Sequence, residues 1–341
     1  MDVTVIGLAG CGKSTLLAAL TGQDAGKAQI ATVKVPDPRL DKLVEIYHPK
    51  KTTYAEIRAR EAAWPGAGEG KRRSEMERYL DLIKGSSLFI HVVRACMTPA
   101  AADEPDVPRD LAKLDGEMIF ADLFALERLL ERERVQPMDA TRKHAVLKAK
   151  ELLESEQPLW SAELDEHDRA GLTGLNLVTL TPQLIVINLD ENTPPDNAPL
   201  PAPTVLWGRQ AIPVCLTVAA EVATLPPDEQ DAFAAEMGLG EPAAHRIARA
   251  AFAQLNLISF FTVGDDDCHA WPVPAGTTAQ KAAGSIHSDL ERGFIRAEIV
   301  PYQTLVDLGS LKACRDTGKL QVEGKNYVLS DGEIMHVRFN V

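Results

Sequence analysis

The sequence predicts an α/β fold with a mostly parallel sheet and a separate C-terminal module, on three observations. A β-branched run, Asp2 to Ile6, leads into a glycine-rich loop and then into apolar residues at helical spacing. A second short apolar run, residues 183–187, is bounded by polar residues, as is typical of a strand buried inside a parallel sheet. From residue 257 onward the chain changes to short strand patterns separated by turns, which indicates the C-terminal module.

Length and composition narrow the range of functions. The chain has 341 residues, enough for two or three domains at about 150 residues each. Hydrophobic residues make up 45% and charged residues 25%, an ordinary globular balance. The net charge of −13 argues against a dedicated nucleic-acid binder, because phosphate affinity comes from clustered cations. We therefore expect no DNA partner.

The cysteines and the apolar runs bear on location. The 5 cysteines are scattered without metal-ligand spacing, as expected for free thiols in a reducing compartment. The N-terminus lacks the pattern of a signal peptide, and no apolar run approaches the roughly 18 residues that span a bilayer. We expect a cytoplasmic protein with no membrane partner.

The first loop carries the clearest chemical signal, since strand, GxxxxGK[ST] and helix follow one another directly. Glycines let the backbone turn so that successive amides and the helix N-terminus cradle phosphate groups. Lys13 is expected to neutralise the β- and γ-phosphates, and the Ser14 hydroxyl to bind Mg²⁺. The predicted phosphate-binding residues are Leu8, Ala9, Gly10, Cys11, Gly12, Lys13, Ser14 and Thr15.

Cys11 stands where a lowered thiol pKa is expected, at a helix N-terminus. Oxidation there would block phosphate entry. The alternative, which we favour, is that Cys11 is a small filler, since free cysteines are often structural.

Base recognition is expected after the strand of residues 183–187. Asn188, Leu189 and Glu191 stand where guanine-specific P-loop proteins carry Asn-Lys-x-Asp. The extra methylene of Glu191 moves its carboxylate out of register with guanine, and adenine would be accepted through other contacts. An ordinary acidic loop is the open alternative. Thr217, Val218 and Ala219, in a predicted small-residue loop after a strand, are a second set of base contacts.

These segments together resemble the YchF/Obg-like ATPase family. The resemblance is carried by residues 35–43 (VPDPRLDKL), by the tetrapeptide of residues 188–191 and by dense matches over residues 261–341. It implies a TRAFAC-class P-loop domain, a helical insertion and a C-terminal TGS-like, ubiquitin-like β-grasp domain. It also implies ATP preferred over or alongside GTP, and association with the ribosome or ribosomal RNA.

The chain departs from the family pattern around the expected switches. Thr32 is the one candidate for the threonine that completes Mg²⁺ coordination. The family's Asp-x-x-Gly is absent, and Glu61 and Gly66 are weak candidates for its roles. The loop of residues 97–108 contains no histidine, whereas the family has one there. We expect nucleotide binding to persist and hydrolysis to be slow or to need a partner.

The predicted organisation is a Rossmann-like P-loop domain with two additions. Residues 1–98 and 176–256 form the nucleotide-binding domain, and residues 99–175 a helical, coiled-coil-like hairpin that either only packs or serves as a contact arm. Residues 257–341 form the β-grasp domain.

Three hypotheses for function follow. The first is a monomeric, slow ATP-hydrolysing switch that also accepts GTP and acts in translation or the stress response. The second is a nucleotide-gated binding module with negligible hydrolysis. The third, ranked last because of Glu191, is a GTP-specific GTPase.

Overall fold

A computed structural model describes residues 1–24, 30–65, 72–101, 103–133, 137–237 and 240–340. The chain divides into two compact units. The first comprises residues 1–33 and 57–247, and the second comprises residues 34–56 and 248–341. This division differs from the predicted one, because residues 34–56 and 248–256 belong with the C-terminal part rather than with the nucleotide-binding part.

The first unit is built on a six-stranded sheet in the order β2-β4-β1-β5-β6-β7. Strand β1 runs parallel to both β4 and β5, and β6 runs parallel to both β5 and β7. Every residue of β5 and β6 is buried, as expected where helices cover both faces of a parallel sheet. The strands are β1 (Asp2–Ile6), β2 (Ile30–Lys34), β4 (Glu56–Glu61), β5 (Leu88–Arg94), β6 (Gln183–Asn188) and β7 (Gln210–Val214).

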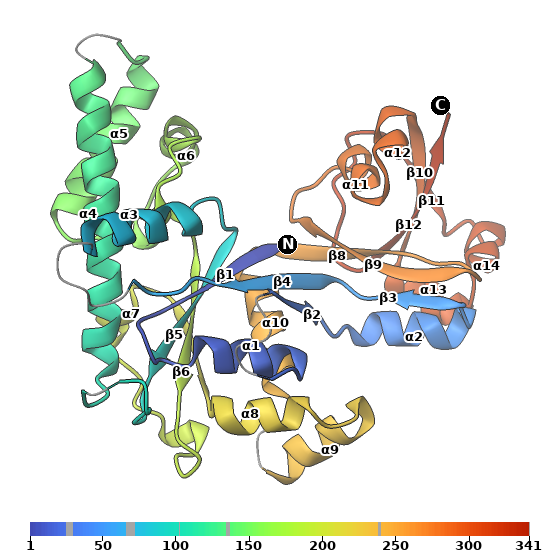
Figure 1. Cartoon of the computed structure of the whole chain (residues 1–341). Coiled ribbons are helices and arrows are strands. Elements are labelled where there is room, and N and C mark those ends of the chain that lie inside the picture. The colour runs from blue at the N-terminus through green and yellow to red at the C-terminus, as the bar shows by residue number, and fades with distance from the viewer. Residues whose placement is uncertain (25–29, 66–71, 102, 134–136, 238–239, 341) are drawn as a thin grey trace. The chain divides into compact units, whose positions relative to one another are not determined.

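Helices surround this sheet, with α1 and α8 packed against each other (Figure 1). The α-helices that begin in this unit are α1 (Lys13–Thr21), α3 (Arg72–Ile83), α4 (Val107–Glu133), α5 (Ala140–Glu154), α6 (Glu166–Leu172), α7 (Pro203–Leu206), α8 (Leu216–Ala223), α9 (Pro227–Glu236) and α10 (Ala243–Gln254). The short 3₁₀ turns are η1 (Leu159–Ser161), η2 (Val178–Leu180) and η3 (Pro195–Asn197).

The predicted helical hairpin is confirmed as α4 and α5 (Figure 1). Leu111, Leu114, Met118 and Leu126 lie on α4 at helical spacing, and all are at most 1% exposed. The outer half of the hairpin has a core of its own, in which Leu126 packs with α5, η1 and the segment before η2. Burial on α4 from Val107 to Leu126 and on α5 from Ala145 to Leu153 therefore holds the hairpin in place.

The second unit contains a sheet in the order β11-β10-β12-β8-β9-β3. If β8 is counted as the first strand and β12 as the fifth, the order read from β9 to β11 is second-first-fifth-third-fourth. This order, with β8 and β12 parallel at the centre, is the ubiquitin-like β-grasp arrangement. Its strands are β3 (Lys51–Thr53), β8 (Leu257–Thr262), β9 (Asp267–Pro274), β10 (Phe294–Pro301), β11 (Gln321–Glu323) and β12 (Glu333–Phe339). Its helices are α2 (Pro38–Tyr47), α11 (Ala279–Ile286), α12 (Ser288–Arg292), α13 (Tyr302–Leu308) and α14 (Leu311–Asp316).

Two predicted elements of this unit were wrong. The single helix expected near residues 278–290 is broken at His287, whose side chain caps α12 by accepting a hydrogen bond from the Asp289 amide. The strand expected at residues 327–329 is reduced to one isolated bridge between Thr278 and Val328.

Helix α2 belongs to the second unit because of its apolar face. Leu40 and Leu43 are both 0% exposed and pack with Phe261 and Ile334 of the β-grasp sheet. Arg39 adds ion pairs to Asp37 and Asp331, and these two carboxylates raise the pKa of its guanidinium.

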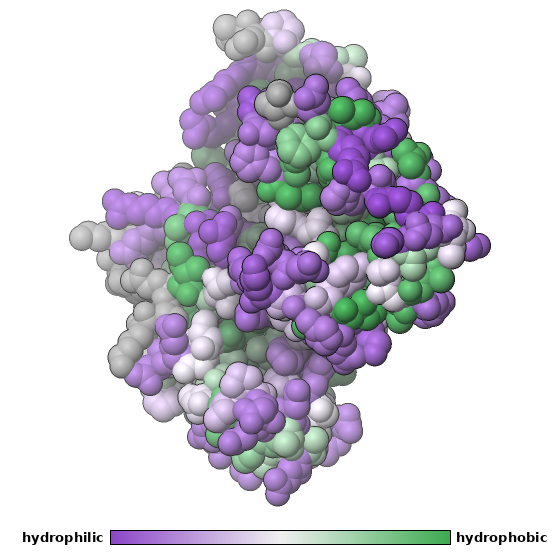
Figure 2. All heavy atoms as spheres, turned by 90° about the vertical axis from the view of Figure 1, so that its right-hand side faces the viewer, coloured by the Kyte–Doolittle hydropathy of each residue, from purple (hydrophilic) through white to green (hydrophobic). Residues whose placement is uncertain are grey.

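The face shown in Figure 2 mixes apolar and hydrophilic side chains.

Among the residues that the structure describes, no helix has both the length and the apolar character needed to cross a bilayer.

Candidate functional site

The glycine-rich loop joins β1 to α1 as the sequence predicts. Gly7 and Gly12 have φ of 145° and 107°, in the region that favours glycine. A Cβ at Gly7 would lie 2.4 Å from the carbonyl oxygen of Val92, and one at Gly12 would lie 2.6 Å from the Asn188 Nδ2. Both glycines are therefore required for the loop to pass so close to β5 and β6.

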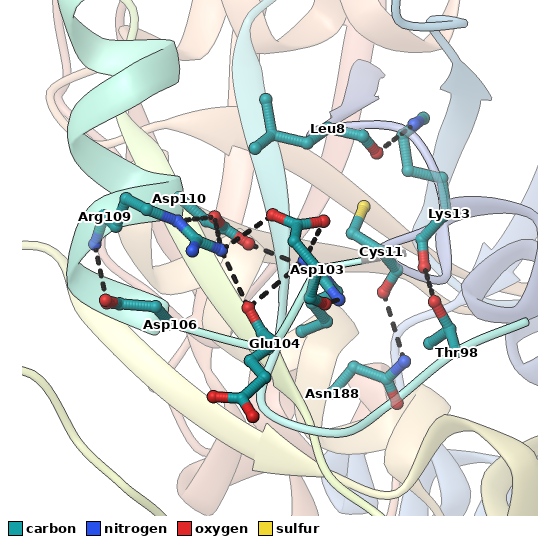
Figure 3. Close-up of polar contacts among 12 residues, drawn as sticks. Leu8, Cys11, Lys13, Thr98, Asp103, Glu104, Asp106, Arg109, Asp110 and Asn188 are labelled. Carbon is teal, nitrogen blue, oxygen red and sulfur yellow. Dashed lines mark hydrogen bonds and ion pairs between the residues drawn. The ribbon is translucent and has the colours of Figure 1, made fainter. Parts of the chain in front are cut away.

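Lys13 is held ready inside this loop. Its Nζ donates to the carbonyl oxygens of Gly7 and Leu8, at 3.0 and 2.9 Å, and the residue is only 6% exposed (Figure 3). A buried ammonium is stabilised only when it is hydrogen-bonded or paired with an anion. The Lys13 ammonium therefore has only neutral carbonyl oxygens as hydrogen-bond partners in the structure. A bound phosphate would give it a negatively charged partner instead.

Ser14 and Glu61 meet at the start of α1. The Ser14 hydroxyl donates to the Glu61 Oε2 at 2.8 Å. Glu61 ends β4, which runs beside β1 with Glu61 opposite Val5, so sheet pairing fixes this contact. The structure thus brings together two of the predicted residues, from positions 47 apart in sequence.

The oxygens of Ser14 and Glu61 fit Mg²⁺. This ion prefers oxygen ligands and is commonly held by one or two protein groups together with phosphates and waters. Among the described residues there is no cluster of three or more His, Cys, Asp or Glu side chains that could hold a metal. A hydroxyl and a carboxylate beside a phosphate-binding loop are therefore the donor set that a shared nucleotide–Mg²⁺ site requires.

Asn188 connects the end of β6 to this loop. Its Nδ2 donates to the Cys11 carbonyl at 3.1 Å, and its Oδ1 accepts from the Leu216 amide at 3.3 Å. Figure 3 shows Asn188 directed at Cys11. Asn188 therefore braces the loop against α8, a role that its amide fills before any base is bound.

The remaining predicted base contacts are only partly placed at the site. The Leu189 side chain is 2% exposed and packs in the core with Ile187 and Val107, so it cannot line a base. Glu191 is exposed beside this strand end.

Residues 217–219 are also placed differently from the prediction, which expected a loop. They form the first turn of α8, with Thr217 exposed, Val218 partly exposed and Ala219 buried. The run Leu216–Ala223 is rich in alanine, which favours the helix.

Thr32 and Gly66 are the two remaining switch candidates. Thr32 lies exposed in β2, where alternate residues are buried. Gly66 lies outside the described residues.

The Cys11 thiol is buried beneath the loop. Burial raises the pKa of Cys11, and the nearby Lys13 offsets this only in part. The lowered pKa expected from the helix N-terminus is therefore wrong for this residue, since its sulfur is packed under the loop, where a Cβ on Gly7 would lie 2.7 Å from it.

A loop after β5, residues 95–106, crosses the phosphate-binding loop, and the sequence did not predict this contact. Thr98 Oγ1 donates to the Gly10 carbonyl at 2.9 Å. A Cβ at Gly10 would lie 3.0 Å from the backbone of Ala100. The segment that lacks a histidine is therefore the one in contact with the phosphate-binding loop.

Two arginines, Arg94 and Arg109, hold the far end of this loop through ion pairs. Arg94, whose side chain is 4% exposed, forms ion pairs with Asp103 at 2.8 Å and Asp110 at 3.5 Å. Arg109 bonds to the same two carboxylates. The only sequence signal for this network is an arginine at a strand end followed by an acidic loop, a pattern too common to identify it.

Comparisons with known proteins find similar chains. A family named YchF-GTPase_C, described as "Protein of unknown function (DUF933)", matches residues 257–340. The "Ribosome-binding ATPase YchF" of Haemophilus ducreyi is 33% identical over 357 residues, covering 99% of this chain and 98% of that protein. The "Ribosome-binding ATPase YchF" of Bacillus subtilis is 33% identical over 360 residues with the same coverage.

A solved structure is similar along the whole chain. The "Structure of the Schizosaccharomyces pombe YchF GTPase" aligns with a TM-score of 0.86 and 25% identity, covering 99% of this chain and 97% of that one.

Proposed function

This chain belongs to the YchF family, and from that premise we propose that it is a ribosome-associated P-loop ATPase acting as a slow switch in the cytoplasm. The observation that carries the proposal is the contact between Ser14 and Glu61 beside the buried Lys13. It supplies, at one point, the cation, hydroxyl and carboxylate that a nucleoside triphosphate with Mg²⁺ requires.

The chain's own residues have distinct tasks in this proposal. The loop amides of residues 8–15 receive the phosphates, and the Lys13 Nζ exchanges the carbonyls of Gly7 and Leu8 for phosphate oxygens. Ser14 and Glu61 would hold Mg²⁺, which neutralises charge on the β- and γ-phosphates when bound. Thr32 is the further candidate ligand, if residues 21–34 rearrange.

Support for ATP over GTP comes from the end of β6. A guanine-specific site needs a basic stem and an aspartate there, whereas this chain has the buried Leu189 and the exposed Glu191. We propose that adenine is accepted through contacts at the first turn of α8, near Thr217, with GTP as a weaker ligand.

Slow turnover is supported by the composition of the crossing loop. Residues 95–106 lie against Gly10 and contain no histidine to position a water. The same observation favours a second candidate, a nucleotide-gated binding module with negligible hydrolysis.

One experiment separates these candidates. Calorimetry with ATP, ADP, GTP and GDP is followed by single-turnover phosphate release on the same sample, with and without ribosomes. ATP binding with slow release that ribosomes accelerate supports the switch. Tight ATP binding without release under either condition selects the binding module, and a strong preference for GTP contradicts the assignment of the base.

The matched variants are Lys13→Ala and Lys42→Ala. Removing the Lys13 ammonium should weaken ATP binding roughly 100-fold, about 3 kcal/mol. Lys42 pairs with Glu45 on the exposed side of α2, and its removal should leave ATP affinity unchanged. Equal ATP affinity for Lys13→Ala and the wild type would contradict the site itself.

A further inference from the structure

The face of the β-grasp sheet that packs against α13 and α14 carries a cationic cluster at one end. Val300 of β10 and Ile334 of β12 lie in the core on this face. Alternate positions along a strand share a face, so the residues further along both strands lie on it too. These residues are Arg296 and Glu298 of β10 and His336 and Arg338 of β12. Both arginines and the histidine are exposed, so the helices leave this end of the face open.

Glu298 organises two guanidinium groups in the cluster. Its carboxylate pairs with the Arg315 Nη2 at 2.8 Å and with the Arg338 Nε at 3.3 Å. Arg315 comes from α14, where its neighbour Cys314 is fully buried in the core on the same face. Each guanidinium has five N–H donors, and the two arginine side chains are 52% and 47% exposed. One carboxylate thus orients two cations and neutralises the charge of only one.

Arg296 stands directly opposite Arg338 in the antiparallel pairing of β10 with β12. Like charges at opposite positions of such a pair are destabilising. Within the described part of the chain, the Arg296 side chain has no hydrogen-bond or ion-pair partner that offsets this repulsion. The arrangement therefore lowers the stability of the sheet, and a bound anion between the two arginines would offset the cost.

Two exposed lysines extend the cluster along α14. Lys312 precedes Arg315 by three residues, which places both side chains on one side of the helix. Lys319 follows the helix, where its amide donates to the Cys314 carbonyl at 2.8 Å. These cations outnumber the carboxylates of the cluster, Glu298 and Asp316, although the whole chain has a net charge of −13. The cluster is therefore a local positive site on an acidic protein.

The chemistry of the cluster fits the phosphate groups of an extended polyanion. Guanidinium groups bind phosphate oxygens through paired hydrogen bonds, and Glu298 already holds two of these groups in fixed positions. Sites for small ligands are concave and mostly apolar, whereas these side chains lie exposed on an open sheet end.

His336 adds an aromatic ring to the cluster, directly opposite Glu298. Partial burial and the nearby Arg338 lower the pKa of His336, so its imidazole is neutral near pH 7. Neutral imidazoles and guanidinium planes both stack on unpaired bases. Bases are present in RNA but absent from an acidic peptide or an anionic lipid, so the ring favours RNA.

From these observations we propose that the cationic cluster binds the phosphate backbone of RNA. Arg296, Arg315 and Arg338 contact phosphates, and His336 stacks against an unpaired base. The proposal rests on the ribosome association proposed above, and it names the surface that contacts ribosomal RNA. The contact is local, since the net negative charge of the chain repels RNA elsewhere.

The test uses the full-length chain and a short fluorescein-labelled RNA stem-loop, which offers both a stem and unpaired bases. Anisotropy over a range of salt concentrations measures RNA affinity for the wild type, for Arg296→Gln and for Arg296→Gln combined with Arg338→Gln. The matched control is Lys281→Gln. It removes one exposed cation from α11, a helix that packs with Ala297 and Ile299 on the opposite face of the sheet.

Each lost phosphate contact should weaken RNA binding about fivefold at about 0.1 M salt and reduce the slope of log K against log[salt] by roughly 0.7. The double variant should lose two contacts, and Lys281→Gln should bind like the wild type. The melting temperature of Arg296→Gln should not fall, because the substitution removes a like-charge pair. Absence of RNA binding by the wild type, or equal affinity of the double variant and the control, would overturn the proposal.

Other polyanions test the competing occupants. Polyglutamate and vesicles containing phosphatidylserine are added to the same proteins. Weaker binding of both than of RNA supports the proposal. Tighter binding of polyglutamate would assign the cluster to an acidic peptide, and tighter binding of vesicles would assign it to a membrane surface. Either result would overturn the proposal.

Two further measurements separate this proposal from the proposed function. ATP affinity of the double variant should equal that of the wild type, because the nucleotide site lies in the first unit. RNA binding through the cluster by a chain that fails to bind ATP would support the cluster and contradict the ATPase. Co-sedimentation of the double variant with ribosomes as complete as that of the wild type would overturn the cluster and leave the ribosome association intact.

Discussion

In the nucleotide site, the Lys13 and Ser14 side chains form hydrogen bonds that contacts with a bound nucleotide and Mg²⁺ would replace. Lys13 donates to two carbonyls, and Ser14 donates to the Glu61 carboxylate. These hydrogen bonds satisfy the Lys13 ammonium and the Ser14 hydroxyl where they are partly buried, and so avoid the free-energy cost of an unpaired polar group. The loop is therefore already ordered around the positions that phosphate and Mg²⁺ need.

The substitution Glu61→Gln tests the carboxylate. It keeps the shape and an acceptor for Ser14 but removes the negative charge. We expect the affinity for ATP with Mg²⁺ to fall about 10-fold or more, as is usual when a residue supporting a metal is changed, while ATP affinity in EDTA stays the same. Calorimetry under both conditions measures this, with Glu45→Gln on the surface of α2 as control. An equal loss with and without Mg²⁺ would assign Glu61 a purely structural role.

The raised pKa of Cys11 makes a prediction about pH. The thiolate is the reactive form, so a thiol whose pKa lies above its ordinary value reacts slowly at neutral pH and faster as pH rises. Burial raises the pKa of Cys96 as well, so the difference in exposure decides the order of modification. In the native protein, N-ethylmaleimide should modify the half-buried Cys96 before the buried Cys11 at every pH from 7 to 9. Peptide mass spectrometry gives the order. Modification of Cys11 first at pH 7 would show an activated thiol.

The sequence predicted single residues well where their partners are local. Gly7 to Thr15 form one segment, so the loop and its lysine could be predicted together. Thr98 and Gly10 are 88 positions apart, and nothing in residues 95–106 marks them as a cover for the loop. Leu189 could not be placed either, because the sequence does not show to which side of a strand end a side chain turns.

At the level of elements, α3 packs against the strand that leads into the phosphate-binding loop. Tyr79 of α3 lies in one core with Ile6 of β1, and the centroids of the Tyr79 and Trp64 rings are 5.3 Å apart in edge-to-face geometry. Burial raises the pKa of Tyr79.

A buried carboxylate fixes α4 to η2. Asp122 accepts hydrogen bonds from the Val178 amide at 3.0 Å and from the amide and hydroxyl of Thr179 at 2.7 and 2.6 Å. Replacing Asp122 by alanine leaves these buried donors without a partner, so the free energy of unfolding should fall by about 3 kcal/mol. Urea unfolding measures the change. Glu127→Ala, on an exposed position of α4, should change it by less than about 0.5 kcal/mol.

At the level of elements, sequence patterns succeeded for long periodic segments and failed for short ones. The stripe of Leu111, Leu114 and Met118 predicted α4 correctly. The sequence around His287 predicted one helix. The side chain of His287 ends α11 and caps α12, but this break leaves the helical spacing of the apolar residues unchanged. Residues 216–223 read partly as a loop, although their alanines favour the helix that forms.

At the level of the whole molecule, the two units are not consecutive in sequence. Residues 34–56 supply α2 and β3 to the C-terminal sheet, where β3 pairs with β9. The sequence could not show this, because the partners of Leu40 and Leu43, from Phe261 to Ile334, lie more than two hundred positions later. Resemblance placed the β-grasp domain, but only the packing of α2 shows what completes its core.

The substitution Leu43→Ala tests this membership. Removing a fully buried leucine should destabilise the second unit by about 3 kcal/mol. Native-state hydrogen exchange should then show lost protection in β8, β9 and β12, with β1 and β5 unchanged. Glu45→Ala, at an exposed position of the same helix, is the control. Lost protection in β1 rather than β8 would place α2 in the first unit.

The placement of α2 also has a consequence for co-translational folding. A ribosome finishes residues 34–56 early, yet the strands that cover Leu40 and Leu43 come last. At ~5–20 residues per second, the interval is on the order of half a minute. For that time the nascent chain carries an apolar helix with nothing to pack against, a surface that chaperones recognise.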